Sequence, residues 1–212
     1  MRRRTGVILA LDITDASRAA ALAQSCRDSV DALKVGLPLT LSAGVGIVHT
    51  LSAVADVVCD FKIADIPPIA AEIARIAFRS GARGVICHGF AGEDSLRAIV
   101  GAATGEVFVL TEMSHPGGAD FTAPVADRIA RLAVRADAHG IVAPATRPER
   151  VRALRDIVGS LQILAPGAGA QGGRPVDAIR AGADFVIVGR AITEAANPAR
   201  AAEAIAAEIA AV

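Results

Sequence analysis

Residues 57–79 read VVCDFKIADIPPIAAEIARIAFR, an apolar run followed closely by a segment of helical periodicity. The run from Val57 to Phe61 is rich in β-branched residues, which is typical of a strand buried on both faces. From Ile69 to Arg79 the apolar residues recur three and four positions apart, and Pro67 stands near the start of this segment, where a missing N–H costs little. The stretch therefore predicts a β-strand, a short polar loop and an α-helix.

The same unit recurs along the 212 residues, and we count eight strand and helix pairs. Strands are expected at Val7–Leu11, Ala32–Val35, Val57–Phe61, Gly84–Cys87, Val107–Leu110, Gly140–Val142, Gln162–Leu164 and Phe185–Val188. Helices are expected at Ser17–Cys26, Leu39–Leu51, Ile69–Arg79, Glu93–Ala102, Ala123–Asp137, Pro148–Val158, Val176–Ala181 and Pro198–Ala211. This alternation requires a parallel sheet, and eight units in about 200 residues match the lower size of a TIM barrel. The sequence thus predicts an α/β fold, one (β/α)₈ barrel domain over residues 1–212, with an open doubly wound sheet as the alternative.

The composition limits the class of partner. Acidic and basic residues number 22 each, so no overall charge favours nucleic acid or a membrane surface. Aromatic residues make up 3% of the chain, with no Trp or Tyr, so the stacking platforms that single-stranded nucleic acid needs are absent. A small molecule is therefore the expected partner, without nucleic acid or membrane.

The chain has the features of a cytoplasmic protein. The apolar run Val7–Leu11 after Met1–Arg4 is shorter than the roughly 7 to 15 residues of a signal-peptide core, so no cleaved leader is expected. No segment reaches the roughly 18 uncharged apolar residues of a membrane span. The three cysteines, Cys26, Cys59 and Cys87, are odd in number and lack metal-type spacing, which suits a reducing compartment.

Only two of the 22 basic residues are lysines, Lys34 and Lys62. Arginine is the default cation of this chain, so a retained lysine indicates a need for a compact point charge and a proton that can leave. Both lysines fall on the rim where barrel enzymes place their catalytic groups, the carboxyl ends of the strands. Asp12, Asp60 and Asp65 are expected on the same rim, so the sequence predicts an alternating array of carboxylates and ammonium groups.

Asp60 and Lys62 are two residues apart, so on an extended strand they point to the same side, while Phe61 points into the helix layer. An ion pair that only closes the barrel is the alternative to a functional site. The other charged residues are expected on the same rim, and removing so many charges from water is costly. A functional site is therefore favoured over an ion pair that only closes the barrel.

The loop at 167–172, GAGAQG, has the G-x-G-x-x-G form but not the context of a dinucleotide site. It follows the seventh expected strand rather than the first, and the next strand ends in Arg190 rather than in an acid. Barrel enzymes often bind phosphate at the loops after strands seven and eight, where Gln171 and Arg190 would add side-chain donors. A merely flexible glycine loop is the alternative.

The remaining polar residues are weaker candidates for a catalytic role. Ser114 has no base at a readable spacing, so a hydroxyl that contacts a ligand is expected rather than a nucleophile. His88 ends a strand, and a structural hydrogen bond is expected for it, whereas His49, His115 and His139 are expected at the surface. No cluster of His, Asp and Glu beyond the acids already named supports a metal site.

Several motifs, in order along nearly the whole chain, together resemble the orotidine 5'-monophosphate decarboxylase family, closest to its archaeal form. They are LALD (9–12), LKVG (33–36), DFKIADIP (60–67), HGF (88–90), TEMSHPG (111–117), TRPER (146–150), PGAGAQGG (166–173) and VGR (188–190). The resemblance implies cofactor-free and metal-free decarboxylation of orotidine monophosphate to uridine monophosphate (UMP) in pyrimidine biosynthesis.

Residue roles also follow from the resemblance. Asp12 and Lys34 would hold the ribose hydroxyls, with Lys34 bonded to Asp60, and Lys62 would protonate the ring carbon after carbon dioxide leaves. Asp65 would enter the site of the neighbouring subunit in a homodimer.

For the rest of the nucleotide, the resemblance implies that Ser114 contacts the pyrimidine. Gln171, Gly189 and Arg190 would grip the phosphate. The apolar wall would consist of Ile86, Leu110, Val142 and Pro166. One departure is Ile69, which stands where many relatives have a threonine, so a hydroxyl contact near the subunit boundary is missing.

Two other functions stay open at this point. A magnesium-dependent keto-sugar phosphate decarboxylase or hexulose phosphate synthase would share the Asp-x-Lys-x-x-Asp strand, although Lys34 favours the metal-free reaction. A protein that binds a nucleotide without turning it over is the alternative from another class.

Overall fold

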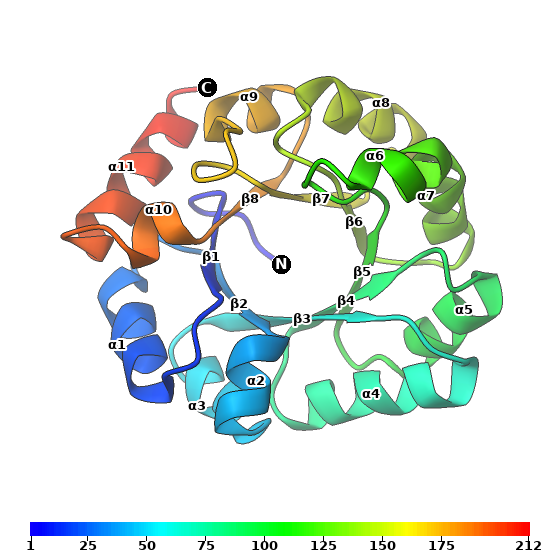
Figure 1. Cartoon of the computed structure of the whole chain (residues 1–212), viewed down its shortest axis with the longest axis horizontal. Coiled ribbons are helices and arrows are strands. Elements are labelled where there is room, and N and C mark those ends of the chain that lie inside the picture. Colours follow the sequence, from blue (N-terminus) through cyan, green and yellow to red (C-terminus); the bar gives the residue numbers. More distant parts are fainter.

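The computed structural model describes all residues from 1 to 212 and is a closed parallel β-barrel surrounded by helices (Figure 1). Each strand pairs with its neighbours in sequence, and the last pairs with the first. The strands are β1 (Val7–Leu11), β2 (Ala32–Gly36), β3 (Asp56–Ile63), β4 (Gly84–His88), β5 (Glu106–Leu110), β6 (Gly140–Val142), β7 (Gln162–Pro166) and β8 (Phe185–Val188). The predicted (β/α)₈ barrel is confirmed, and the open doubly wound sheet is wrong.

The helices lie outside the barrel and separate successive strands. They are α1 (Ala16–Cys26), α2 (Leu37–Ala43), α3 (Gly46–Ser52), α4 (Pro67–Arg79), α5 (Glu93–Ala102), α6 (Gly118–Phe121), the 3₁₀ turn η1 (Ala123–Val125), α7 (Ala126–Arg135), α8 (Pro148–Val158), α9 (Pro175–Arg180), α10 (Arg190–Thr193) and α11 (Pro198–Ala210). None of them combines the length and the apolar character that crossing a bilayer requires.

The helices differ from the prediction in two ways. The single helix expected over 39–51 is two helices, because Gly44 adopts a φ of 77° that no helix accommodates. The short helices α6 and α10 were not predicted, since four residues within a loop carry no readable periodicity.

Two hydrophobic layers hold the barrel together. The larger, with 50 buried residues, lies between the strands and the helices, and the smaller, with 12, fills the barrel interior. Phe108 occupies the interior between Gly84 and Gly140 of the adjacent strands, where an added Cβ would lie 2.9 and 2.7 Å from its ring. These two glycines therefore make room for the ring that plugs the barrel.

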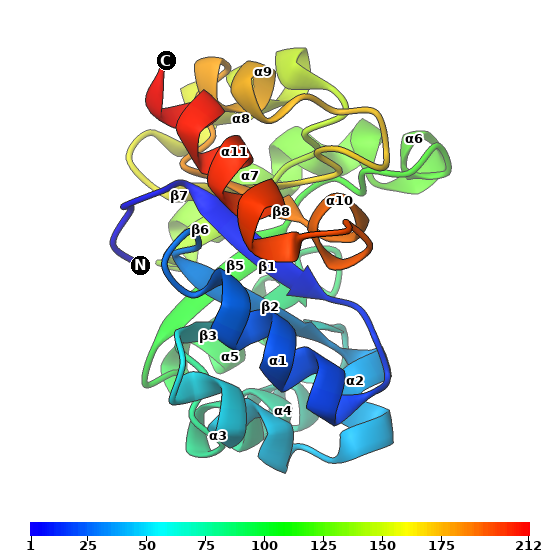
Figure 2. The ribbon, with the colours of Figure 1, turned by 90° about the vertical axis from the view of Figure 1, so that its left-hand side faces the viewer.

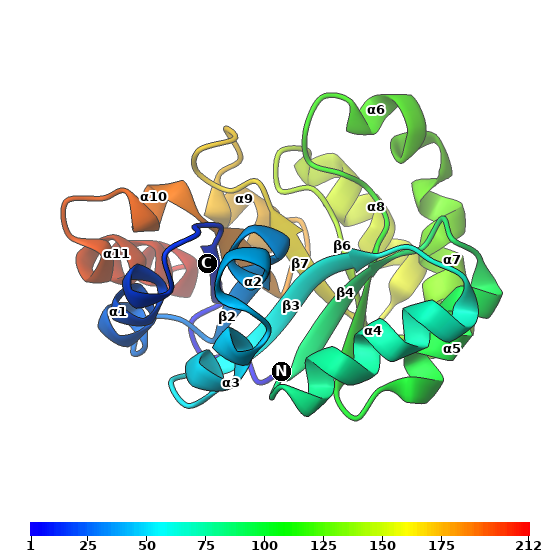
Figure 3. The ribbon, with the colours of Figure 1, turned by 60° about the horizontal axis from the view of Figure 1, so that its bottom comes forward.

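The two ends of the barrel differ. At one end Met1 packs into the interior layer, and its ammonium group contacts Glu106 and Gln162. Figure 2 places the N-terminus at this end and α6 at the other. Figure 3 shows α6 and the loop between β7 and α9 projecting at the open end, to which the carboxyl ends of the strands point.

Candidate active site

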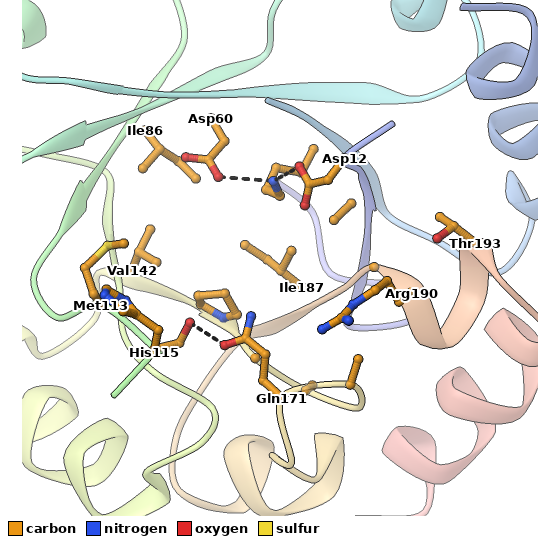
Figure 4. Close-up of a pocket in the computed structure, with 18 of the residues that line it drawn as sticks. Asp12, Asp60, Ile86, Met113, His115, Val142, Gln171, Ile187, Arg190 and Thr193 are labelled. Atoms are coloured by element: carbon orange, nitrogen blue, oxygen red, sulfur yellow. Dashed lines mark hydrogen bonds and ion pairs between the residues drawn. The ribbon is translucent and has the colours of Figure 1, made fainter. Parts of the chain in front are cut away.

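A cavity of about 750 Å³ opens at the carboxyl ends of the strands. Twelve of the thirteen predicted site residues line it: Asp12, Lys34, Asp60, Lys62, Ile86, Leu110, Ser114, Val142, Pro166, Gln171, Gly189 and Arg190. Asp65 does not. Figure 4 shows Asp12 and Asp60 on one side of this cavity and Gln171 and Arg190 on the other.

The charged residues continue the inward-facing rows of the barrel strands. Ala32 and Val58 face the interior layer, and Lys34 and Asp60 follow each of them by two positions, so they emerge on the same face. Apolar side chains thus fill the lower barrel, and charges replace them at the mouth.

Four charges form a continuous chain across the cavity floor. The Lys34 Nζ atom lies 2.7 Å from a carboxylate oxygen of Asp12 and 3.1 Å from one of Asp60. The Lys62 ammonium donates to both oxygens of Asp60, at 2.9 Å each. The side chains of Lys34 and Asp60 are 8% and 9% exposed, whereas that of Lys62 is 38% exposed. Lys34 and Asp60 are therefore buried, whereas Lys62 and Asp12, whose side chain is 54% exposed, remain open to a ligand.

Mutual attraction outweighs burial in this cluster. Burial alone would raise the pKa of the Asp60 carboxyl, but the charges of Lys34 and Lys62 lower it. Burial alone would likewise lower the pKa of the Lys34 ammonium, but Asp60 and Asp12 raise it. Lys34 and Asp60 therefore both stay charged at neutral pH, although they are buried.

Lys62 reaches Asp60 through an irregular backbone rather than a regular strand. Its φ is 45°, and the pairing of β3 with β4 shifts register between Cys59 and Ile63. A left-handed conformation costs a residue with a Cβ roughly 1–2 kcal/mol, so the surrounding structure imposes it. Phe61 packs on the helix side of the barrel, as predicted.

Ser114 and Gln171 close one side of the cavity. The Ser114 hydroxyl donates to Oε1 of Gln171 at 2.9 Å, which links the loop after β5 to the loop after β7. The sequence assigned these two residues to different parts of a ligand, and it did not predict that they bond to each other.

The glycine loop and β8 form the far end of the cavity. Gly167, Gly169 and Gly172 all have positive φ values, so the backbone follows a path that other residues rarely adopt. Arg190 points into the cavity from the start of α10 and pairs with no carboxylate (Figure 4). The apolar wall consists of Ile86, Leu110, Val142, Pro166 and Ile187.

Asp65 lies outside the cavity of its own chain. It is exposed, and its carboxylate accepts a hydrogen bond from the backbone N–H of Ile66 at 2.8 Å. Ile66 and Ile69 beside it are 62% and 47% exposed. A second cavity, of about 310 Å³, borders Lys34, Asp60 and Lys62 on the flank next to α2.

A buried ion cluster behind the site was not predicted. Glu112 follows β5 with a fully buried side chain, and its two oxygens accept from Nε of Arg147 at 2.9 Å and of Arg150 at 2.8 Å. Arg147 also donates to the carbonyl of Met113, next to Ser114. The cluster therefore fixes the base of the loop that carries Ser114. In the sequence, the one indication of this cluster was an acidic residue, Glu112, just after a strand.

The structural hydrogen bond expected for His88 is wrong. Its Nδ1 atom is buried without a partner, and its ring lies 4.5 Å from that of Phe90. Burial, and then the charge of Lys62, lower the pKa of this histidine. Nothing in the local sequence HGF indicates that the histidine lacks a hydrogen-bond partner.

Comparison with known proteins places the chain in a family. The family described as "Orotidine 5'-phosphate decarboxylase / HUMPS family" matches residues 5–205. A curated relative named orotidine 5'-phosphate decarboxylase, from Methanosarcina acetivorans, is 52% identical over 99% of this chain and 96% of its own. A relative of the same name from Pyrococcus horikoshii is 45% identical over 96% and 98% of the two chains.

A solved structure agrees with these relatives. The orotidine 5'-monophosphate decarboxylase of Methanocaldococcus jannaschii, complexed with the inhibitor BMP, superposes with a TM-score of 0.92 at 40% identity. The superposition covers 96% of this chain and 98% of that one. From the match over residues 5–205 and the identity to full-length relatives, this chain belongs to the orotidine 5'-phosphate decarboxylase / HUMPS family.

Proposed function

We propose that this chain catalyses the decarboxylation of orotidine 5'-monophosphate to UMP without a cofactor, as a step of pyrimidine biosynthesis. The relatives that are 38–52% identical over at least 91% of this chain carry the name of that enzyme. The observation that carries the proposal is the Lys62 ammonium, clamped at 2.9 Å by both oxygens of Asp60 and still exposed to the cavity.

The chemistry explains why an ammonium is needed at this place. When the bond between C6 of the pyrimidine and its carboxylate breaks, carbon dioxide leaves and the electron pair stays on an sp² carbon with little delocalisation. A positive charge that is already in position lowers the free energy of that carbanion. Lys62 then transfers a proton from Nζ to C6, which yields UMP and a neutral amine that water reprotonates.

Asp60 holds Lys62 in position. The carboxylate holds the ammonium against the cavity wall, and its own lowered pKa keeps it ionised. An arginine would supply the charge but not the proton, because a guanidinium hardly deprotonates in proteins. This requirement accounts for a lysine in a chain that otherwise uses arginine.

The other lining residues match the parts of a nucleotide. Asp12 and Lys34 lie at the cavity floor, where the Lys34 ammonium would donate a hydrogen bond to a ribose hydroxyl and the Asp12 carboxylate would accept one. The apolar wall suits the pyrimidine ring, and Ser114 with Gln171 would close over it. Arg190, Gln171 and the backbone at Gly189 would hold the phosphate, whose remote binding energy favours the transition state.

We further propose a homodimer in which Asp65 completes the site of the other subunit. Asp65, Ile66 and Ile69 form an exposed acidic and apolar loop, and a second cavity beside Lys62 offers a place for it. A third carboxylate there would oppose the otherwise open side of the ammonium. The same proposal places the enzyme in the cytoplasm, because its three cysteines are free and buried.

Chelation separates this reaction from a magnesium-dependent relative. We expect the purified protein to decarboxylate orotidine monophosphate at the same rate with and without EDTA, followed by the fall in orotate absorbance. A rate that EDTA removes and magnesium restores would contradict the proposal, as would binding of UMP without any turnover of orotidine monophosphate.

Mixing two inactive variants tests the shared site. Lys62→Ala and Asp65→Ala chains that are unfolded and refolded together should recover about one quarter of the wild-type activity, because half of the dimers carry one intact site. Lys62→Ala mixed with Asp60→Ala is the matched control and should recover none, since those residues belong to one chain. Equal recovery in the two mixtures, or none in either, would refute the exchange of Asp65.

A further inference from the structure

Arg18 lines the same cavity as Arg190, although neither the sequence motifs nor the roles given above include it. It lies in the first turn of α1, where Asp15 caps the backbone N–H of Arg18 at 3.0 Å. Its guanidinium donates through Nη2 to the carbonyl of Thr193 at 3.0 Å. Thr193 ends α10, the short helix that begins with Arg190, and Figure 4 places these two residues on the same side of the cavity.

Arg18 and Arg190 are the two cations of the cavity that pair with no carboxylate. Lys34 and Lys62 are neutralised within the chain of charges on the floor. Neither arginine lies within 4.0 Å of an acidic oxygen. An arginine has five N–H donors, and Arg18 uses one of them on Thr193. Most of its donors therefore remain free for a ligand.

The charge balance of the cavity depends on Arg18. Four cations and three carboxylates, those of Asp12, Asp60 and Glu194, line the cavity. Without Arg18 the charged side chains of the lining would cancel, and a phosphate dianion would enter a cavity with no net attraction. With Arg18 the lining is positive, and the excess lies at the end formed by α1 and α10.

We infer that Arg18 is a second phosphate-recognition residue, which binds the 5'-phosphate of the nucleotide together with Arg190. The inference rests on the proposed function, because it takes the phosphate to lie beside α10. The bond to Thr193 orients the guanidinium fork, so that its remaining N–H groups face the anion with less loss of side-chain entropy.

Binding of UMP and of uridine separates a phosphate contact from a general effect. Arg18→Gln should weaken the binding of UMP about tenfold in calorimetry, as expected for the loss of a charge-assisted hydrogen bond, and leave uridine binding unchanged. The loss should shrink at high salt. Arg131→Gln is the matched control, because Arg131 is exposed on α7, outside the cavity and free of ion pairs.

A second experiment separates direct contact from support of α10. If Arg18 acts only by holding Thr193 and hence Arg190, Arg18→Gln should cost nothing further in an Arg190→Ala background. Direct contact predicts that UMP binding weakens again in the double variant. Unchanged UMP binding in Arg18→Gln, an equal loss for uridine, or no further loss in the double variant would each overturn the inference.

The binding experiments test the role of Arg18 independently of the proposed decarboxylation. A wild-type protein that binds UMP but does not decarboxylate orotidine monophosphate would contradict the proposed function alone, because the comparison of UMP with uridine uses binding only. If the wild type decarboxylates and Arg18→Gln binds UMP normally, the role of Arg18 alone is refuted.

Discussion

Lys62→Ala should lower kcat for orotidine monophosphate by a factor on the order of 10⁴ or more, because both the stabilising charge and the proton donor are lost. Binding of UMP should remain, since the ribose and phosphate contacts come from other residues. Lys62→Arg should also turn over poorly, because a guanidinium keeps the charge without releasing a proton. The orotate absorbance assay gives kcat, and calorimetry with UMP gives the affinity.

A control for folding is needed because Lys62 has a φ of 45°. Asparagine tolerates this conformation better than alanine does, so Lys62→Asn keeps the backbone geometry while it removes the ammonium. Both variants should unfold at temperatures close to that of the wild type. Turnover within tenfold of the wild-type rate in either folded variant would refute the assigned role.

Arg190→Ala should raise KM for orotidine monophosphate about 100-fold, because a dianion loses a charge-assisted contact in a partly enclosed cavity. Arg190 forms no ion pair, so its removal leaves no unpaired carboxylate behind. The effect should therefore fall on substrate binding and leave the thermal stability unchanged.

The same substitution should leave the binding of uridine unchanged, since uridine lacks the phosphate. Arg131→Ala, which removes an exposed arginine of α7, is the control and should leave KM as it is. A KM for Arg190→Ala equal to that of the wild type would move the phosphate site elsewhere.

The barrel was predictable because parallel strands must be apolar on both faces. Each strand appears as a short β-branched run, and the eight expected strands agree with the structure to within two residues at each end. The short helices α6 and α10 were not predictable in this way, because local hydrogen bonds in loops, such as that from Thr193 to the carbonyl of Gly189, hold them rather than a repeating apolar face.

The charges on the cavity floor were predictable for a related reason. A strand has a period of two, so Asp60 shares a face with the interior residue Val58, whereas Lys62 joins Asp60 through the irregular backbone at the end of β3, which the period does not predict. The strand-end rule then placed Asp12 and Lys34 beside them, and the structure brings all four together.

Residues whose partners come from distant loops were not predictable. Glu112 meets two arginines that lie 35 and 38 positions away in sequence, and Arg18 meets Thr193 from the other end of the chain. His88 ends β4, yet no group lies within reach of its buried Nδ1. Position along a strand fixes the direction of a side chain, but only the tertiary arrangement of the loops decides what it meets.

A crystal structure with bound UMP tests the central claim most directly, through the distance from Nζ of Lys62 to C6 of the pyrimidine. The account predicts about 3–3.5 Å, the separation of a near-attack geometry, with Asp60 still bonded to the ammonium. A Lys62 side chain turned away from the ring, or another residue in contact with C6, would contradict it.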